Sequence, residues 1–437
     1  MVNKSSLVLM VSPQMDNNKK EDRNEHGLVR MTAKTRALMG FKEDTVELWN
    51  GESDLTRIKS STVLSIFKAF SADIAAAKAL VEKGELDKEA IYNVAFVTTR
   101  TYQRIMADHK NDKNIWVTDG VADTVIGADP EFLLFTKEGL VRHANSIAHL
   151  KKDGLIGFDG AMAEIRPDPA VTPEGLVKSI SSIFHNDAYT KPIMDFDWKS
   201  GVYHKDKNRD YPIGGHIHIG NPAKVARISA DERELFFRVL NKILDELLSL
   251  PMMRLDGEAG TQRRTKCQMG NYGYFGAYRV HDGRLEYRTL SGLWLAHPTL
   301  TKIVMGVAKA IIDDVYYKVY ENQFAMSYMC PNKFKGVNVL KADFDSWDGI
   351  PLAKDIGCVR TSKVMFDLIN KSDAKIVDKA FVTDWYTTMR GLSSYEKYRR
   401  YIDDLKTLLS RPLKELQNIN TDIKAGWLDG EEFSIKL

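Results

Sequence analysis

The stretch GGHIHIG, residues 214–220, has the alternation of a β-strand with two different faces. Side chains two residues apart in a strand point to the same side, so His216 and His218 share one face while Ile217 and Ile219 share the other. Such alternation is typical of an antiparallel sheet that packs one face on the core and exposes the other. We therefore expect a polar surface above this strand.

Three further segments repeat the arrangement with charged residues. The residues that share a face are Asp129 and Glu131 in VIGADPEFLLF (125–135), Glu164 and Arg166 in GAMAEIRPDP (160–169), and Arg284, Glu286 and Arg288 in DGRLEYRTL (282–290). Together the four segments predict an α+β fold, in which an antiparallel sheet has helices on one face and an active-site cleft on the other. The alternative is a solvated sheet face, although none of these segments contains lysine.

The polar face would gather several carboxylates and an imidazole. Such a group repels itself unless cations neutralise it, and oxygen ligands with little nitrogen suit Mg²⁺ or Mn²⁺. Arginines between the carboxylates have the fork geometry that binds phosphate or carboxylate oxygens in pairs. The combination indicates metal-assisted phosphoryl chemistry.

Three regions follow from the patterns along the chain. We expect an N-terminal module over 1–120 (a small β unit plus a helix), a catalytic domain over 121–330 and a mostly helical region over 331–437. Apolar residues spaced three and four apart predict an amphipathic helix from 62 to 86. Three further helix starts are predicted at Thr172-Pro173, at Ser229 with Glu232, and at Pro298.

The charge is nearly balanced, with 62 Lys and Arg against 59 Asp and Glu, so nucleic acid is an unlikely partner. The sequence has no apolar run long enough to cross a bilayer, so we expect no membrane association. Cys267, Cys330 and Cys358 are odd in number and widely spaced, which favours a reducing compartment. A cytoplasmic location is expected.

The motifs GADPEF, DGAMAEIRPDP, GGHIHIG and RLEYR occur in an order that resembles the glutamine-synthetase-like carboxylate-amine ligases. The resemblance is strongest to the phage-type amidoligase branch, COOH-NH2 ligase type 2, and covers about residues 125–300. It implies a glutamine-synthetase-like core that uses ATP and Mg²⁺ or Mn²⁺ to join a carboxylate to an amine through an acyl phosphate. It also implies the host cytoplasm if the gene is a phage gene, and a possible homo-oligomer.

The resemblance implies two divalent metals. Their expected ligands are Glu131, Glu164, His216 and Glu286, with Asp129 as an additional ligand. Many relatives carry Glu at the position of Asp129, so its shorter side chain could coordinate through water.

The resemblance also assigns the basic residues. Arg284 is expected at the ATP phosphates with assistance from His218, and Arg288 at the substrate carboxylate. Arg284, Glu286 and Arg288 form the expected catalytic set. Arg263 and Arg264 are interpreted as further nucleotide or substrate contacts, or simply as loop charges.

Other functions remain open from the sequence. His216 and His218 with a carboxylate could hold zinc in a hydrolase. A guanidino-kinase-like phosphotransferase or an inactive binding or structural protein would also use such a face. The two substrates are undetermined and could be small molecules, peptides or protein side chains. Segments 203–215 and 273–278 are candidates for lids or substrate selectors.

Overall fold

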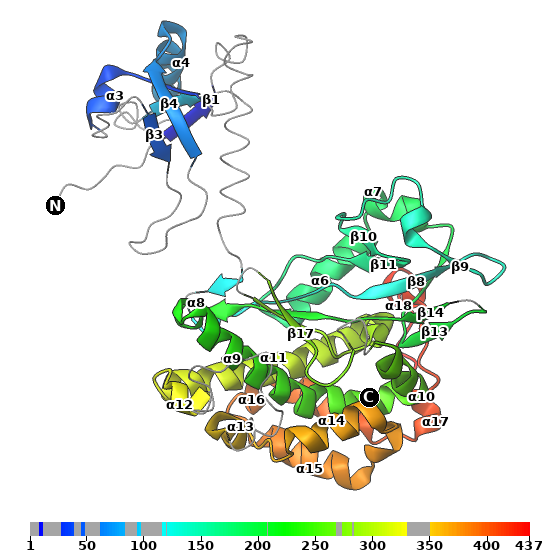
Figure 1. The fold of residues 1–437 in the computed structure, drawn as a ribbon. Helices are drawn as coiled ribbons and strands as arrows, with labels where there is room; N and C mark the ends of the chain where they lie inside the picture. The colour runs from blue at the N-terminus through cyan, green and yellow to red at the C-terminus, as the bar shows by residue number, and fades with distance from the viewer. Residues whose placement is uncertain are drawn as a thin grey trace. The chain divides into compact units, whose positions relative to one another are not determined.

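The computed structural model of the 437-residue chain divides into two compact units, Met1–Asn114 and Ile115–Leu437 (Figure 1). It describes residues 8–11, 28–38, 45–48, 62–83, 94–97, 116–118, 120–207, 209–267, 273–281, 284–329 and 350–437. The two units are described separately.

The N-terminal unit is built on a mixed five-stranded sheet. Its order is β1 (Val8–Val11), β5 (Val94–Val97), β2 (Leu28–Met31), β4 (Thr62–Lys68) and β3 (Thr45–Leu48), with helices α3 (Ala33–Leu38) and α4 (Ser71–Glu82). The prediction of a helix from 62 is wrong for 62–68, which form β4. TVLSIFK is rich in β-branched and aromatic residues, which favour strands, and the helix begins only at Ser71. Residues 84–86 of the predicted helix lie outside the described residues.

The C-terminal unit contains two larger sheets, both antiparallel. The first has the order β17 (Tyr278–His281), β18 (Arg284–Tyr287), β15 (Ile217–Ile219) and β7 (Ile126–Ala128). The second has the order β10 (Ile156–Asp159), β11 (Met162–Ile165), β8 (Glu131–Phe135) and β12 (Asp197–Lys199), with β9 (Val141–Arg142) also paired to β8. Two short pairs complete the strands: β13 (Tyr203–Lys205) with β14 (Asp210–Pro212), and β6 (Val117–Thr118) with β16 (Asn221–Pro222).

The two larger sheets meet where Pro130 separates β7 from β8. Proline has no N–H for a sheet ladder, so the chain leaves the first sheet there and enters the second. The segment before β15 follows both strands, since the Glu131 N–H donates to the Gly214 carbonyl at 2.9 Å. On its other side the Gly215 N–H donates to the Leu290 carbonyl at 3.0 Å. Because β15 pairs with β7 and Gly214 accepts from Glu131, the residues before and after Pro130 contact the same neighbouring segment, 214–219.

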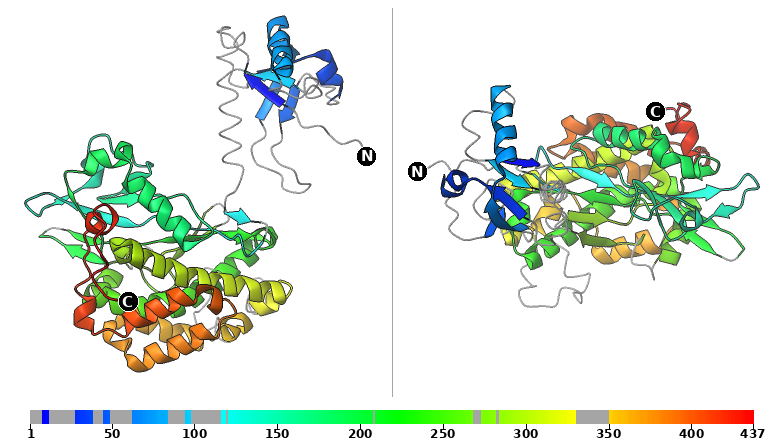
Figure 2. Two further views of the ribbon diagram at one scale, coloured as in Figure 1. Left: turned by 180° about the vertical axis from the view of Figure 1, so that it is seen from behind. Right: turned by 90° about the horizontal axis from the view of Figure 1, so that it is seen from above.

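Helices provide most of the core. The longer ones are α6 (Pro173–Phe184), α9 (Ala230–Leu244), α10 (Leu250–Cys267), α11 (Pro298–Glu321), α14 (Ser362–Lys371), α15 (Lys379–Arg390) and α16 (Tyr395–Leu409). The shorter ones are α7 (Asp187–Thr190), α8 (Ala223–Arg227), α12 (Met326–Met329), α13 (Pro351–Asp355), α17 (Leu413–Leu416) and α18 (Ile423–Trp427). Helix α11 lies between α6 and the C-terminal helices, with α16 packed along it (Figures 1 and 2).

The predicted helix starts at residues 172, 229 and 298 are confirmed by α6, α9 and α11. Thr172 Oγ1 accepts from the Gly175 N–H at 3.0 Å. Ser229 Oγ accepts from the Glu232 N–H at 3.3 Å and donates to Glu232 Oε2 at 2.8 Å, so the Ser229 cap is present while the Glu232 side chain binds the hydroxyl. The α+β class is confirmed as well. No helix among the described residues is both long and apolar enough to cross a membrane.

Candidate metal centre and active site

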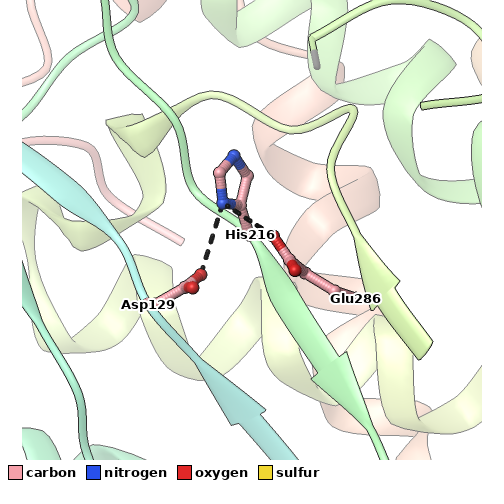
Figure 3. Close-up of side chains that lie close together, drawn as sticks. All are labelled: Asp129, His216 and Glu286. Carbon is pink, nitrogen blue, oxygen red and sulfur yellow. Dashed lines mark ion pairs between the residues drawn. The ribbon is translucent and has the colours of Figure 1, made fainter. Parts of the chain in front are cut away.

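Two carboxylates from different strand segments converge on His216. Its Nδ1 lies 3.4 Å from Asp129 Oδ1 and 3.5 Å from Glu286 Oε1 (Figure 3). Asp129 stands between β7 and β8, His216 directly precedes β15, and Glu286 lies in β18. The three ligand atoms lie within 4.8 Å of one another, so they could hold one metal ion. We call these three residues the histidine cluster.

The strand register explains part of this convergence and adds two basic groups. In the ladder, His218 stands directly opposite Glu286. His218 Nε2 lies 3.0 Å from Asp129 Oδ2, and its Nδ1 accepts from Arg284 Nε at 2.9 Å. The Arg284 guanidinium also lies 4.7 Å from the ring centroid of Trp116. Arg284 and His218 therefore form one basic end of the site.

A second acidic pair is formed by Glu131 in β8 and Glu164 in β11, which stand opposite each other in the ladder. Both are buried, and Glu131 Oε2 accepts from the Gly214 N–H at 2.6 Å. Glu164 forms an ion pair with Arg166. We call Glu131 and Glu164 the glutamate pair.

Gly214 shows that the glutamate pair lies next to the histidine cluster. A Cβ at this position would lie 2.7 Å from His216 Nε2 and 2.8 Å from Glu131 Oε2. His216 thus has Asp129 and Glu286 near its Nδ1 and Glu131 near its Nε2. The imidazole stands between the two acidic groups, and the absence of a side chain at Gly214 makes this approach possible.

The two acidic groups differ in their electrostatics. Burial raises the pKa of Glu131 to about 7, with Asp159 and Asp129 adding repulsion and His216 opposing it. Burial also raises the pKa of Glu164 to about 8, with repulsion from Asp129 and partial relief from Arg166. Burial acts in the same direction on Asp129, but His218 and His216 outweigh it and hold its pKa below the usual range. The glutamate pair therefore has too little neighbouring positive charge to keep its pKa values at their ordinary level.

Arg288 connects the histidine cluster to a cavity. Its Nε lies 2.9 Å from Glu286 Oε1, while Arg279 approaches Glu286 Oε2 at 3.8 Å. Arg288, Glu131 and His216 line a cavity of about 290 Å³. Side chains from all four sequence motifs thus come together around one concave site.

The structure does not bring Arg263 and Arg264 to this site. Both lie in helix α10, so the interpretation as loop charges is wrong. Arg263 is buried and donates to the carbonyls of Thr289 and Leu290 at 2.8 and 2.7 Å. Arg264 is also buried and lies 3.8 Å from Asp256. Their charge next to a glycine- and tyrosine-rich segment resembled a ligand loop, but a helix turns both guanidinium groups into the protein.

The described residues of the two candidate lids make defined contacts. Segment 203–215 contains the β13–β14 hairpin, whose Tyr211 and Ile213 pack with Leu133 in a small apolar cluster. In segment 273–278, the Gly276 N–H donates to Asp245 Oδ2 at 2.7 Å. The hairpin borders the cavity directly, through residues 209–212.

Two residues near the site were missed from the sequence. Trp116 packs over Gly127, where a Cβ would lie 2.5 Å from the indole Cη2. Asp159 lines the cavity beside Glu131. Trp116 carries no sequence signal, because it contacts the site only through folding. Asp159 could have been found, because an Asp-Gly turn places it on the same hairpin face as Glu164.

A comparison with known protein families bears on the central part of the chain. Residues 126–336 match the family model described as "Phage phiEco32-like COOH.NH2 ligase-type 2". The match places this segment among the carboxylate–amine ligases. Within that class, the segment belongs to the phage phiEco32-like COOH.NH2 ligase type 2 family, and the family resemblance seen in the sequence is confirmed.

The other comparisons add little. No curated protein matches the chain. Among solved structures, a bifunctional glutathione synthetase from Pasteurella multocida aligns with a TM-score of 0.37 and 11% identity, over 70% of this chain and 48% of that one. The chain thus spans about half the length of that protein. A likeness at this level supports no argument about fold or activity.

Proposed function

We propose that the chain is an ATP-dependent ligase that joins a carboxylate to an amine through an acyl phosphate, on a glutamine-synthetase-like core. The observation that carries this proposal is the histidine cluster with the glutamate pair next to it across Gly214. The family match over residues 126–336 supports the ligase class. Small molecules and peptides are the substrates that such a family implies.

The donor set fits two hard divalent cations such as Mg²⁺ or Mn²⁺. Asp129, His216 and Glu286 would hold one, and Glu131 with Glu164 would hold the other. The raised pKa values of Glu131 and Glu164 support the second site, because a bound cation would compensate for their repulsion and burial. When bound, the cations would neutralise phosphate charge and orient the nucleotide.

The proposed reaction solves a leaving-group problem. A carboxylate does not condense with an amine at neutral pH, because oxide would have to leave. Transfer of the γ-phosphoryl group from ATP to a carboxylate oxygen gives an acyl phosphate and ADP. The nitrogen lone pair of the neutral amine then forms the C–N bond, the C–O bond to phosphate breaks, and the amine loses a proton. The products are an amide, ADP and inorganic phosphate.

The basic side chains divide between the two ends of this reaction. Arg284, hydrogen-bonded to His218, would contact nucleotide phosphates. Arg288 borders the cavity and would hold the carboxylate or its phosphorylated form with a paired fork of donors. We leave Arg263 and Arg264 out of the proposed contacts, since their guanidinium groups bind carbonyls and neighbouring side chains within the protein.

The test is an assay of the purified full chain with ATP, Mg²⁺ and a panel of amines and carboxylates. We expect substrate-dependent release of ADP and phosphate in equal amounts, and two Mn²⁺ bound per chain by electron paramagnetic resonance. ADP released with a stable phosphoamide would show a guanidino kinase instead. Absence of magnesium-dependent ATP binding in calorimetry would show an inactive binding or structural protein.

A further inference from the structure

Trp116 precedes the segment 126–336 that matches the ligase family, yet its side chain lies at the basic end of the site. The Cζ atom of Arg284 lies over the Trp116 ring, 4.7 Å from the centroid. The ring centroids of Trp116 and His218 are 5.6 Å apart, with the ring planes tilted by 35°. A guanidinium within about 6 Å of an indole centroid is attracted by the negative face of the ring. The indole is therefore part of the basic end that Arg284 and His218 form.

The backbone attaches Trp116 to the part of the sheet that carries His218. The Trp116 carbonyl accepts from the Asn221 N–H at 2.6 Å. Strand β6, directly after Trp116, pairs with β16, which begins at Asn221. Strand β16 follows β15 along the chain, and β15 contains His218. Trp116 and His218 are therefore fixed relative to each other through their backbones.

Gly127 provides the space that the indole occupies. It lies directly opposite His218 in the β7–β15 ladder, so a side chain at Gly127 would stand on the same face as the imidazole. A Cβ at this position would lie 2.5 Å from Trp116 Cη2 and 3.2 Å from Trp116 Cζ3. The six-membered end of the indole thus lies over Gly127, on the polar face of the sheet beside His218.

Arg284 is fixed from two directions. Its Nε donates to His218 Nδ1 at 2.9 Å, and Trp116 lies against its guanidinium. His218 Nε2 in turn lies 3.0 Å from Asp129 Oδ2. A long arginine side chain loses rotamer freedom when it binds a ligand, so contacts that fix it beforehand lower the cost of binding. Trp116 and His218 together restrict the direction in which Arg284 presents its guanidinium.

We propose that Trp116 is a positioning residue, whose indole holds the Arg284 guanidinium in the orientation that binds the triphosphate of the nucleotide. The inference rests on the proposed ligase function, in which Arg284 contacts these phosphates. Trp116 acts through Arg284 and does not itself touch the phosphates. Removing both side chains should therefore weaken phosphate binding no more than removing that of Arg284 alone.

The test measures binding of inorganic tripolyphosphate and of a non-hydrolysable ATP analogue to the full chain by calorimetry, both with saturating Mg²⁺. Trp116→Leu should weaken the two ligands alike, each by about fivefold, because the lost contact acts on the phosphates that they share. Trp116→Phe keeps an aromatic face and should weaken them by less than about twofold. Arg284→Gln should weaken both by roughly thirtyfold, and adding Trp116→Leu to it should change neither affinity further.

Phe381→Leu is the matched control, because Arg360 lies 5.0 Å from the Phe381 ring centroid in a pair that does not line the active-site cavity. It should leave both affinities unchanged. Gly127→Ala keeps the tryptophan but displaces its indole, so it should weaken both ligands as Trp116→Leu does. Circular dichroism checks that each variant is folded, and Gly127→Ala takes the place of Trp116→Leu in every comparison if the latter does not fold.

The outcomes separate this inference from the ligase proposal. If Arg284→Gln weakens both ligands while folded Trp116→Leu and Gly127→Ala do not, the positioning role is overturned and the ligase proposal stands. If Trp116→Leu weakens the ATP analogue but not tripolyphosphate, Trp116 contacts the base instead and the positioning role is overturned. Equal losses from Trp116→Leu with and without Arg284→Gln would overturn it as well. If neither ligand binds with Mg²⁺, the ligase proposal fails and the positioning role is overturned with it.

Discussion

The histidine cluster and the glutamate pair occupy adjacent parts of one site but differ in charge balance. Asp129 has two imidazoles within ion-pair distance, and they hold its pKa low despite burial. Glu131 and Glu164 face each other from neighbouring strands, and burial raises the pKa of both. The two imidazoles next to Asp129, rather than a difference in burial, thus account for its low pKa. The glutamate pair therefore depends more strongly on a cation from solution.

The largest expected effect comes from neutralising one ligand in each group. Glu286→Gln and Glu131→Gln should each lower ATP-dependent phosphate release by roughly 10³-fold. Each substitution weakens the binding of one of the two cations that offset the phosphate charge. Each variant should also bind one Mn²⁺ fewer, as measured by electron paramagnetic resonance.

Asp153→Asn provides the control, because Asp153 is an exposed carboxylate that does not line the cavity. Its activity should match that of the unmodified chain, and circular dichroism should show all three variants folded. Persistent turnover in both folded glutamine variants would refute the assignment of the two metal sites.

A smaller effect is expected where the histidine cluster meets the substrate cavity. Arg288→Lys should lower kcat by about 10²-fold with little change in ATP affinity, because an ammonium group cannot reproduce the paired donors of a guanidinium. Steady-state kinetics together with calorimetric ATP binding measure the two quantities. Equal losses in both would place Arg288 at the nucleotide instead.

Gly214→Ala tests the narrow gap between the two acidic groups. The added methyl would crowd His216 and Glu131, whose side-chain ends must shift, so Mn²⁺ affinity should fall about tenfold while the fold is retained. Gly120→Ala is the matched control, since its nearest contact would be an ordinary 3.8 Å from Asp123. Unchanged Mn²⁺ affinity in Gly214→Ala would show that the two groups are not coupled through this gap.

A last expected effect, on stability rather than on catalysis or affinity, is a pH dependence of metal stabilisation. The pKa values of Glu131 and Glu164, about 7 and 8, lie above the ordinary 4.5, so the folded metal-free protein holds extra protons. The stabilisation they provide is complete below about pH 4.5 and is lost as pH rises through about 8. Saturating Mg²⁺ at a hundredfold excess over its dissociation constant should restore roughly 2–3 kcal/mol.

Melting curves with and without Mg²⁺ measure this dependence. The metal-induced rise in Tm should be larger at about pH 9 than at about pH 6, because protons compete with the cation at the lower pH. In Glu131→Gln, the difference between the two pH values should shrink. An equal rise in Tm at both pH values would contradict the charge difference between the two acidic groups.

Much of the site was predictable because strand alternation is a local property. The period of two placed Glu286 and Arg288 on one face, and the structure brings these side chains within 2.9 Å of each other. Other reasoning failed at Arg263, because its charge next to a glycine- and tyrosine-rich segment suggested a ligand contact, whereas its segment folds as a helix. The three- and four-residue apolar spacing that predicted a helix failed at 62–68, where β-branched residues favoured a strand.

Contacts between distant segments were beyond sequence reasoning. Trp116 lies next to His218 and Arg284, with 5.6 Å between the Trp116 and His218 ring centroids, yet nothing local to Trp116 indicates this. The division of the carboxylates into two groups was equally hidden. It depends on which carboxylates lie near His216 Nδ1 and which lies near Gly214, and only the folded chain defines these positions.

Pro130 separates Asp129, which directly follows β7 of the first sheet, from Glu131, which begins β8 of the second sheet. The backbones of Asp129 and Glu131 are joined through Pro130 alone, so their separation changes little when the two sheets move relative to each other. A nucleotide entering such a site would meet two acidic residues whose separation is nearly constant. Structural adjustment to different substrates would then occur mainly where the β13–β14 hairpin borders the cavity.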